Sequence, residues 1–173
     1  VVGIVFTLRL SPELGGVNPL LEAIGLESWT RAWLGDPGTA LPAVIAADVW
    51  RSFGLAMFIF VAGLKGIDVG LYEAARVDGA TSWQQFLHIT LPLLRPVTLT
   101  VVLLVSIQSL KLFDLVYVMT NGGPSHASEV LSTWTYYQAF TFNRMGYASS
   151  ISVTLLLITV AIGILQVRAN REK

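Results

Sequence analysis

Two pairs of charged residues stand inside otherwise apolar stretches of this chain. Asp48 and Arg51 are three residues apart, and Lys111 and Asp114 have the same spacing. Side chains at this spacing share one face of a helix and can pair with each other. Because a charge in an apolar membrane segment is costly, such groups face protein or a water-filled path. They therefore predict either a route for a polar solute or an ion pair between helices, and both interpretations stay open.

Neutral polar residues accompany the second charged pair. Gln108 and Ser109 precede Lys111, and Phe113 follows it. Sugars are recognised by hydrogen-bonding side chains that match their hydroxyls and by aromatic faces, and these residues offer both. The same residues also suit ordinary helix packing.

The chain lacks the residues that most enzyme sites require. It has no cysteine, which excludes disulfides and thiol catalysis and argues against zinc sites. Its two histidines, His88 and His126, are far apart and have no nearby carboxylate and nucleophile. There is no GxxxxGK[ST] phosphate loop. We therefore expect no catalytic residue, no metal site and no cofactor. The formal net charge of +0 also argues against a nucleic-acid partner.

The composition is typical of a membrane protein. Hydrophobic residues make up 54% of the chain and charged residues 13%, against roughly 25% charged residues in soluble domains. A helix that spans a bilayer needs about 20 mostly apolar residues. Three stretches meet this length, so we predict transmembrane helices at 41–65, 93–119 and 146–167.

The first residues are apolar, without an initiator Met or a basic region of the kind that begins a signal peptide. We expect residues 1–8 to be the end of a truncated transmembrane helix. The chain would then be the C-terminal fragment of a longer membrane protein.

Basic residues predict the orientation in the membrane, because cytoplasmic loops carry an excess of Lys and Arg. Segments 66–92 and 168–173, with the flanking positions, hold six basic residues: Lys65, Arg76, Arg95, Arg168, Arg171 and Lys173. The opposite loops, 9–40 and 120–145, hold three: Arg9, Arg31 and Arg144. We therefore predict that 66–92 and the tail are cytoplasmic and that the other two loops are extracytoplasmic.

The polar insert 66–92 has the signals of two short helices joined by a turn. Asp68 is a suitable N-cap for the first helix, and Gly79 is suited to end it. Thr81 or the serine after it caps the second helix, with a glutamine three residues on. Leu91-Pro92 is predicted to end that helix. The insert is thus predicted to be an amphipathic helix–turn–helix that docks into a groove on another protein.

The residues of the insert resemble a known sequence family. Glu73-Ala74-Ala75, then Asp78-Gly79-Ala80, then Ile89-Thr90-Leu91-Pro92 are similar to the EAA loop of ABC importer permeases. The wider match resembles the carbohydrate subgroup, that of the maltose and glycerol-phosphate permeases. It includes Trp50 with Gly54, the run Ser109–Asp114, and Tyr117 with the run Thr120–Pro124. The resemblance covers most of the chain. One departure is that Asp68 and Gly70 stand where the subgroup usually has a proline and an acidic residue.

The resemblance implies an all-α fold, a polytopic membrane helix bundle of the kind found in type I ABC importer transmembrane domains. It implies a multi-pass subunit of a prokaryotic cell membrane that imports a sugar and has no enzymatic activity. ATP would be hydrolysed by a cytoplasmic ABC ATPase dimer. The other implied partners are a second permease subunit in a heterodimer, an extracytoplasmic sugar-binding protein and membrane lipid.

The resemblance also assigns roles to single residues. The glutamate of the EAA run is expected to meet a basic residue in a cleft of the ATPase. The implied coupling residues are Glu73, Ala74, Ala75, Asp78, Gly79, Ala80, Leu91 and Pro92. The positions implied to line the substrate path are Asp48, Arg51, Ser52, Leu55, Ser109 and Leu112.

Two alternatives remain beside the sugar permease. One is an ABC importer permease for another solute, such as an amino acid, a peptide or phosphate. The other is a channel or structural membrane subunit whose cytoplasmic helices only join neighbouring subunits. A docking motif for an ATPase favours an importer, because a channel has no need of one.

Overall fold

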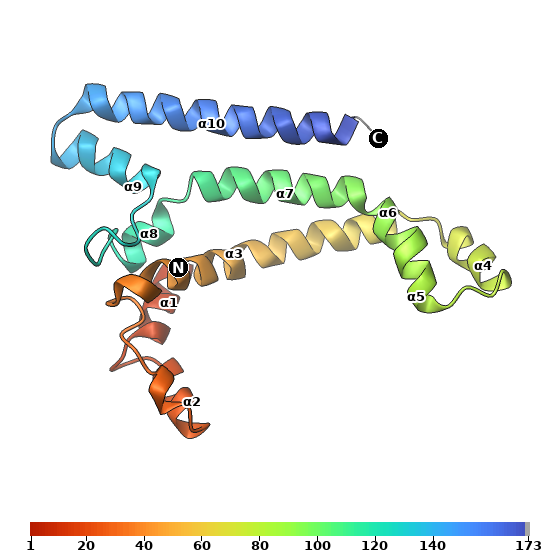
Figure 1. Cartoon of the computed structure of the whole chain (residues 1–173), viewed down its shortest axis with the longest axis horizontal. Helices are drawn as coiled ribbons and strands as arrows, with labels where there is room; N and C mark the ends of the chain where they lie inside the picture. Colours follow the sequence, from red (N-terminus) through yellow and green to blue (C-terminus); the bar gives the residue numbers. More distant parts are fainter. Residues whose placement is uncertain (172–173) are drawn as a thin grey trace. The chain divides into compact units, whose positions relative to one another are not determined.

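The computed structural model describes residues 1–171, with side chains as far as Arg168, and every regular element in that range is a helix (Figure 1). This confirms the predicted all-α class. The backbone divides into two units, which are described separately. The first comprises Val1–Arg51 and Gln108–Val160, and the second comprises Ser52–Ile107 and the residues from Ala161 onward.

Helix α3 (Pro37–Lys65) contains the first predicted transmembrane segment. It begins four residues before the predicted start at residue 41, because Asp36 Oδ1 accepts a hydrogen bond from the Gly38 amide at 2.9 Å. Pro37 then occupies the first turn, where a missing N–H costs little. Its 29 residues give a length of about 44 Å, more than the roughly 30 Å of a bilayer core.

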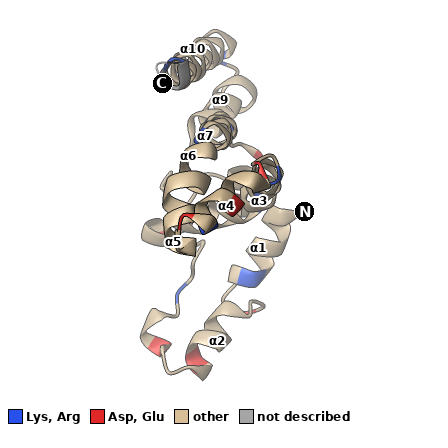
Figure 2. Cartoon of the chain, turned by 90° about the vertical axis from the view of Figure 1, so that its right-hand side faces the viewer, with Lys and Arg blue, Asp and Glu red and all other residues tan. Residues whose placement is uncertain are grey.

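Helix α10 (Met145–Arg171) contains the third predicted segment. It has no charged residue between Met145 and Val167 and is almost free of charge in Figure 2. Within the described residues, α3 and α10 are each long and apolar enough to cross a membrane. The predicted tail 168–173 is therefore helical up to Arg171, and its last two residues, including the predicted basic Lys173, lie outside the described residues.

The second predicted segment, 93–119, is not one helix. Helix α7 (Arg95–Leu110) ends before a break, and helix α8 (Asp114–Met119) follows it. Phe113 has a non-helical backbone, with φ −125° and ψ −55°. Ser132 Oγ donates to the Leu110 carbonyl at 3.4 Å, one of the groups that a helix end leaves without an internal partner. The apolar sequence did not predict this break, because the residues that stabilise it are distant in sequence.

Helix α7 has 16 residues, fewer than the roughly 20 of a full membrane span, and it follows a helical run, Ser82–Leu93. That run comprises α5 (Ser82–Gln85), a π-helical segment Phe86–Thr90 and α6 (Leu91–Leu93). The run and α7 meet at a bend of 57°. Helix α4 (Val69–Val77) precedes them in the second unit. A Cβ added at Gly63 would lie 2.7 Å from Val97 Cγ2, so α3 and α7 pack very closely there.

The apolar core of the first unit joins α3 to α8. Its buried members are Val44, Ala47, Leu112, Leu115, Val116 and Met119. Helix α1 (Val2–Leu10) packs against α8, and a Cβ added at Gly3 would lie 3.3 Å from Val118 Cγ1. The predicted helix at 1–8 is thus present, two residues longer at its C-terminal end.

The two predicted outer loops also contain short helices. Segment 9–40 holds α2 (Val17–Ala23) and a 3₁₀ turn, Glu27–Trp29. Segment 120–145 holds α9 (Leu131–Tyr136), which continues as a π-helical segment, Tyr137–Thr141. These short elements fix the ends of the long helices, so the segments are folded connections.

Candidate functional site

The first arm of the insert is helix α4, which begins and ends as the sequence predicts. The Asp68 side chain accepts a hydrogen bond from the Gly70 amide at 2.9 Å, which caps the helix. Gly79 follows the helix with φ +80°, in the left-handed region that favours glycine. The turn after α4 therefore depends on a backbone conformation that other residues rarely adopt.

The second arm begins with the predicted cap. Thr81 and Gln84 form a reciprocal capping box: the Thr81 hydroxyl accepts from the Gln84 amide at 3.4 Å, and Gln84 Oε1 accepts from the Thr81 amide at 2.8 Å. The second arm ends at Leu93, one residue after the predicted Leu91-Pro92. Pro92 lies in the first turn of α6, where its missing N–H is tolerated, and the bend follows at Leu94.

Two side-chain hydrogen bonds tie the arms of the insert together. The hydroxyls of Tyr72 and Thr90 lie 2.9 Å apart and join α4 to the π-helical segment. Gln85, which is buried, donates to the Ala80 carbonyl at 3.1 Å and holds the turn against α5. These two bonds hold the arms of the insert against each other.

The predicted coupling residues lie on accessible parts of this ordered insert. Ala75 and Ala80 are half-buried, and the others are exposed: Glu73, Ala74, Asp78, Gly79, Leu91 and Pro92. A cavity of about 360 Å³ opens between the two arms, with Ala75, Asp78, Gly79 and Ala80 in its lining. Trp83, which is 67% exposed, stacks on Phe86 with ring centroids 5.6 Å apart. The insert therefore presents carboxylates, small residues and an aromatic pair on one accessible unit.

A three-membered ion cluster lies in the first unit. Arg51 Nη2 is 2.7 Å from Asp48 Oδ1, so the predicted pair is confirmed. Arg51 Nη1 is 3.1 Å from Asp114 Oδ2. The predicted pairing of Lys111 with Asp114 is wrong, because the break at 111–113 removes the shared helical face. No ion pair of Lys111 is present among the described side chains.

The other predicted path residues differ in their surroundings. On α3, Ser52 is half-buried and Leu55 is exposed. Ser109 is exposed near the end of α7, whereas Leu112 is buried in the core of the first unit. Ser52 and Leu55 belong to the second unit, and Ser109 and Leu112 belong to the first. A single path lined by all of these residues stays a prediction.

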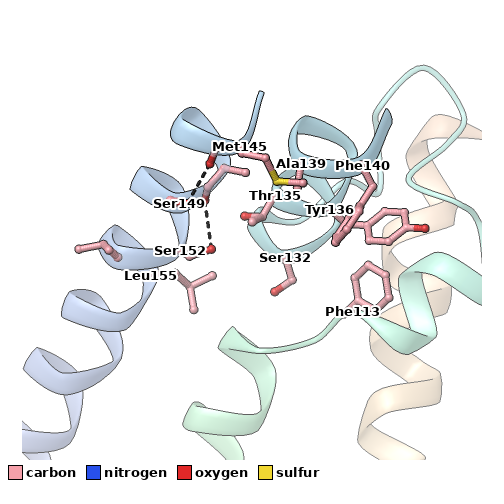
Figure 3. A pocket seen from close by; sticks show the side chains of 12 residues that line it. Phe113, Ser132, Thr135, Tyr136, Ala139, Phe140, Met145, Ser149, Ser152 and Leu155 are labelled. Atoms are coloured by element: carbon pink, nitrogen blue, oxygen red, sulfur yellow. Dashed lines mark hydrogen bonds between the residues drawn. The ribbon is translucent and has the colours of Figure 1, made fainter. Parts of the chain in front are cut away.

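The sequence did not predict one cavity of the described structure. Its volume is about 700 Å³, and it lies in the first unit between α9, the start of α10 and Phe113 (Figure 3). Aromatic rings and hydroxyl groups share its lining: Phe113, Ser132, Thr135, Tyr136, Phe140, Ser149 and Ser152. Tyr136 and Phe140 are four residues apart, and this spacing was a signal that they share one helix face. The side chain of Tyr117 raises the pKa of Tyr136, so this phenol stays neutral to higher pH than usual.

Comparisons with known proteins agree on one kind of relative. Residues 1–172 match the family described as "Binding-protein-dependent transport system inner membrane component". The chain is 43% identical over 168 residues to the probable ABC transporter permease protein YurN of Bacillus subtilis, covering 97% of this chain and 58% of that protein. It is 38% identical over 162 residues to the lactose transport system permease protein LacF of Rhizobium radiobacter, covering 92% of this chain and 54% of LacF.

A solved structure shares the fold. It is the crystal structure of a bacterial alginate ABC transporter in complex with an alginate pentasaccharide-bound periplasmic protein. The TM-score is 0.87 with 26% sequence identity, covering 99% of this chain and 59% of that chain. The chain thus spans somewhat more than half the length of these relatives.

Proposed function

The chain belongs to the family of binding-protein-dependent transport system inner membrane components, and from this premise we propose that it acts in an ABC importer as a permease subunit. Its proposed cargo is a sugar. It takes the sugar from an extracytoplasmic binding protein and passes it across the cell membrane. ATP hydrolysis belongs to a cytoplasmic ATPase dimer, and a second permease subunit completes the membrane part.

The observation that carries this proposal is the ordered insert with the EAA run on its accessible surface. A docking element needs a fixed shape before it binds, since ordering it on contact would cost binding free energy. The Tyr72–Thr90 hydrogen bond and the caps of both arms supply that shape. Glu73 is exposed on α4, where it is free to meet a basic residue of the ATPase.

The choice of a sugar as cargo is supported by the relatives. LacF is named for lactose transport, and the solved relative was crystallised with a binding protein that holds alginate. The proposed path residues are Asp48, Arg51, Ser52, Leu55, Ser109 and Leu112. The ion cluster at Arg51 supports a polar environment near the start of that path.

ATP-dependent uptake tests the proposal directly. The full-length protein is reconstituted in liposomes with its ATPase, its second permease subunit and its binding protein, and a panel of labelled sugars, amino acids and phosphate is offered. We expect uptake of at least one sugar. This uptake should require ATP on the cytoplasmic side and binding protein loaded with that sugar. If only a non-sugar solute is taken up, the proposed cargo is wrong. Flux without ATP would indicate a channel.

A further inference from the structure

The cavity of about 700 Å³ in the first unit has the size of a small-molecule site. Pockets for small ligands generally span roughly 300–1,000 Å³, apolar and aromatic for the most part with a few placed polar groups. Figure 3 shows side chains from α9, from α10 and from the break before α8 around one space. The site combines three segments that are separate in sequence.

Aromatic rings form one side of this cavity. The Tyr136 ring centroid lies 5.3 Å from that of Phe113 and 5.2 Å from that of Phe140. The three rings thus form one cluster, and Phe140 is 66% exposed. An aromatic cluster with an exposed ring offers an apolar face on which the C–H face of a sugar ring can lie.

Hydroxyl groups also line the cavity, and three of them already donate their protons to backbone carbonyls. Thr135 donates to the Leu131 carbonyl at 2.7 Å, and Ser149 donates to the Met145 carbonyl at 2.8 Å. Ser152 donates to the Ala148 carbonyl at 3.0 Å. Each hydroxyl oxygen keeps lone pairs that can still accept. The cavity therefore presents acceptors, and its best ligand carries several hydroxyl donors.

Among the described residues, none of those that line the cavity has a charged side chain. Arg144 precedes Met145 in sequence but is not part of this lining. A carboxylate placed here would lose water without gaining a cation, which is unfavourable.

From these observations, and resting on the proposed function, we propose that this cavity is a substrate subsite for an uncharged sugar unit. The ring lies against Tyr136 and Phe140, and the sugar hydroxyls donate to Thr135, Ser149 and Ser152. The imported sugar is accordingly neutral, and sugars with carboxylate groups are excluded. An acyl chain of a lipid is the competing occupant, but it would leave the acceptors on α9 and α10 unused.

Matched pairs of variants in the complete reconstituted importer test this subsite. Ser149 and Ser150 are adjacent, and both donate to carbonyls of their own helix, but only Ser149 lines the cavity. Phe140 and Phe142 are both exposed aromatics, and only Phe140 lines it. We expect Phe140→Ala to lower neutral-sugar uptake roughly tenfold, the equivalent of one aromatic contact. Ser149→Ala should lower it several-fold, and Ser150→Ala and Phe142→Ala should leave it unchanged.

Two further measurements complete the test. Tyr136→Phe keeps the ring and should retain more uptake than Tyr136→Ala, with both variants present in the assembled complex in equal amounts. Oligosaccharides of uronic acids should neither enter nor compete with the neutral sugar.

The outcomes separate this inference from the proposed function. If the intact complex hydrolyses ATP and imports no sugar at all, the proposed function fails. If it imports a sugar but both members of each matched pair behave alike, the subsite is overturned and the permease role stands. Import of uronic-acid oligosaccharides as readily as neutral ones also overturns the inference, as does a bound lipid that sugar does not displace.

Discussion

At the residue scale, Arg51 connects two carboxylates in different surroundings. The Asp48 side chain is 12% exposed and that of Asp114 is 66% exposed. Removing one partner of a largely buried ion pair leaves the other charge without compensation, whereas an exposed pair contributes little. Arg51 thus stabilises the first unit mainly through Asp48.

The difference in exposure between the two carboxylates predicts which substitution destabilises the protein more. We expect Arg51→Met to lower the free energy of unfolding by about 3 kcal/mol, because Asp48 stays buried without its partner. Asp114→Asn should cost under about 1 kcal/mol. Thermal unfolding of the purified complex in detergent measures both.

A double variant provides the control for Arg51. In Arg51→Met with Asp48→Leu, no charge remains buried, so much of the lost stability should return. Equal losses in Asp114→Asn and Arg51→Met, or no recovery in the double variant, would contradict the assigned role of Asp48.

At the element scale, the turn of the insert depends on backbone conformation and not on space. Gly79 has φ +80°, yet nothing lies within 4 Å of a Cβ added there. A β-branched residue in the left-handed region costs about 1–2 kcal/mol, while asparagine tolerates it. We therefore expect Gly79→Val to lower ATP-coupled uptake by a factor of about 5–30 and Gly79→Asn to retain most of it.

The comparison of the two Gly79 variants is informative in either direction. Both proteins need to be shown in the membrane at equal amounts before uptake is measured. Equal loss in both variants would mean that the partner contacts this position directly, and the conformational explanation would be wrong. Wild-type uptake in Gly79→Val would remove the turn from the coupling role.

The elements that could be predicted from the sequence are those that depend on nearby residues. The caps at Asp68 and Thr81 and the turn at Gly79 were predictable because each depends on residues within a few positions of one another. The break between α7 and α8 was not, since it involves a hydrogen bond from Ser132 to Leu110 and the burial of Leu112. The path residues matched by resemblance stay predictions. The cavity at Tyr136 was missed because its lining comes from three segments.

At the scale of the whole molecule, the orientation in the membrane is the main prediction. These 173 residues contain no cysteine, so they contribute no native thiol to the labelling. Ser82 and Thr141 are both exposed, and cysteine is similar in size to either residue. We expect Ser82→Cys to react with a membrane-impermeant thiol reagent only from the cytoplasmic side, and Thr141→Cys only from outside.

Intact cells and inverted vesicles are the two samples for this measurement, and each variant is the control for the other. Labelling of Ser82→Cys in intact cells would reverse the predicted orientation. It would also remove the insert from the reach of a cytoplasmic ATPase.

The close packing at Gly63 has a mechanical consequence. Helices α3 and α7 enter and leave the insert, and at Gly63 they leave no room even for a methyl group beside Val97. Two helices that pivot about each other need free space at their contact, and the contact at Gly63 leaves none. We therefore expect α3 and α7 to move together at this contact whenever the insert moves.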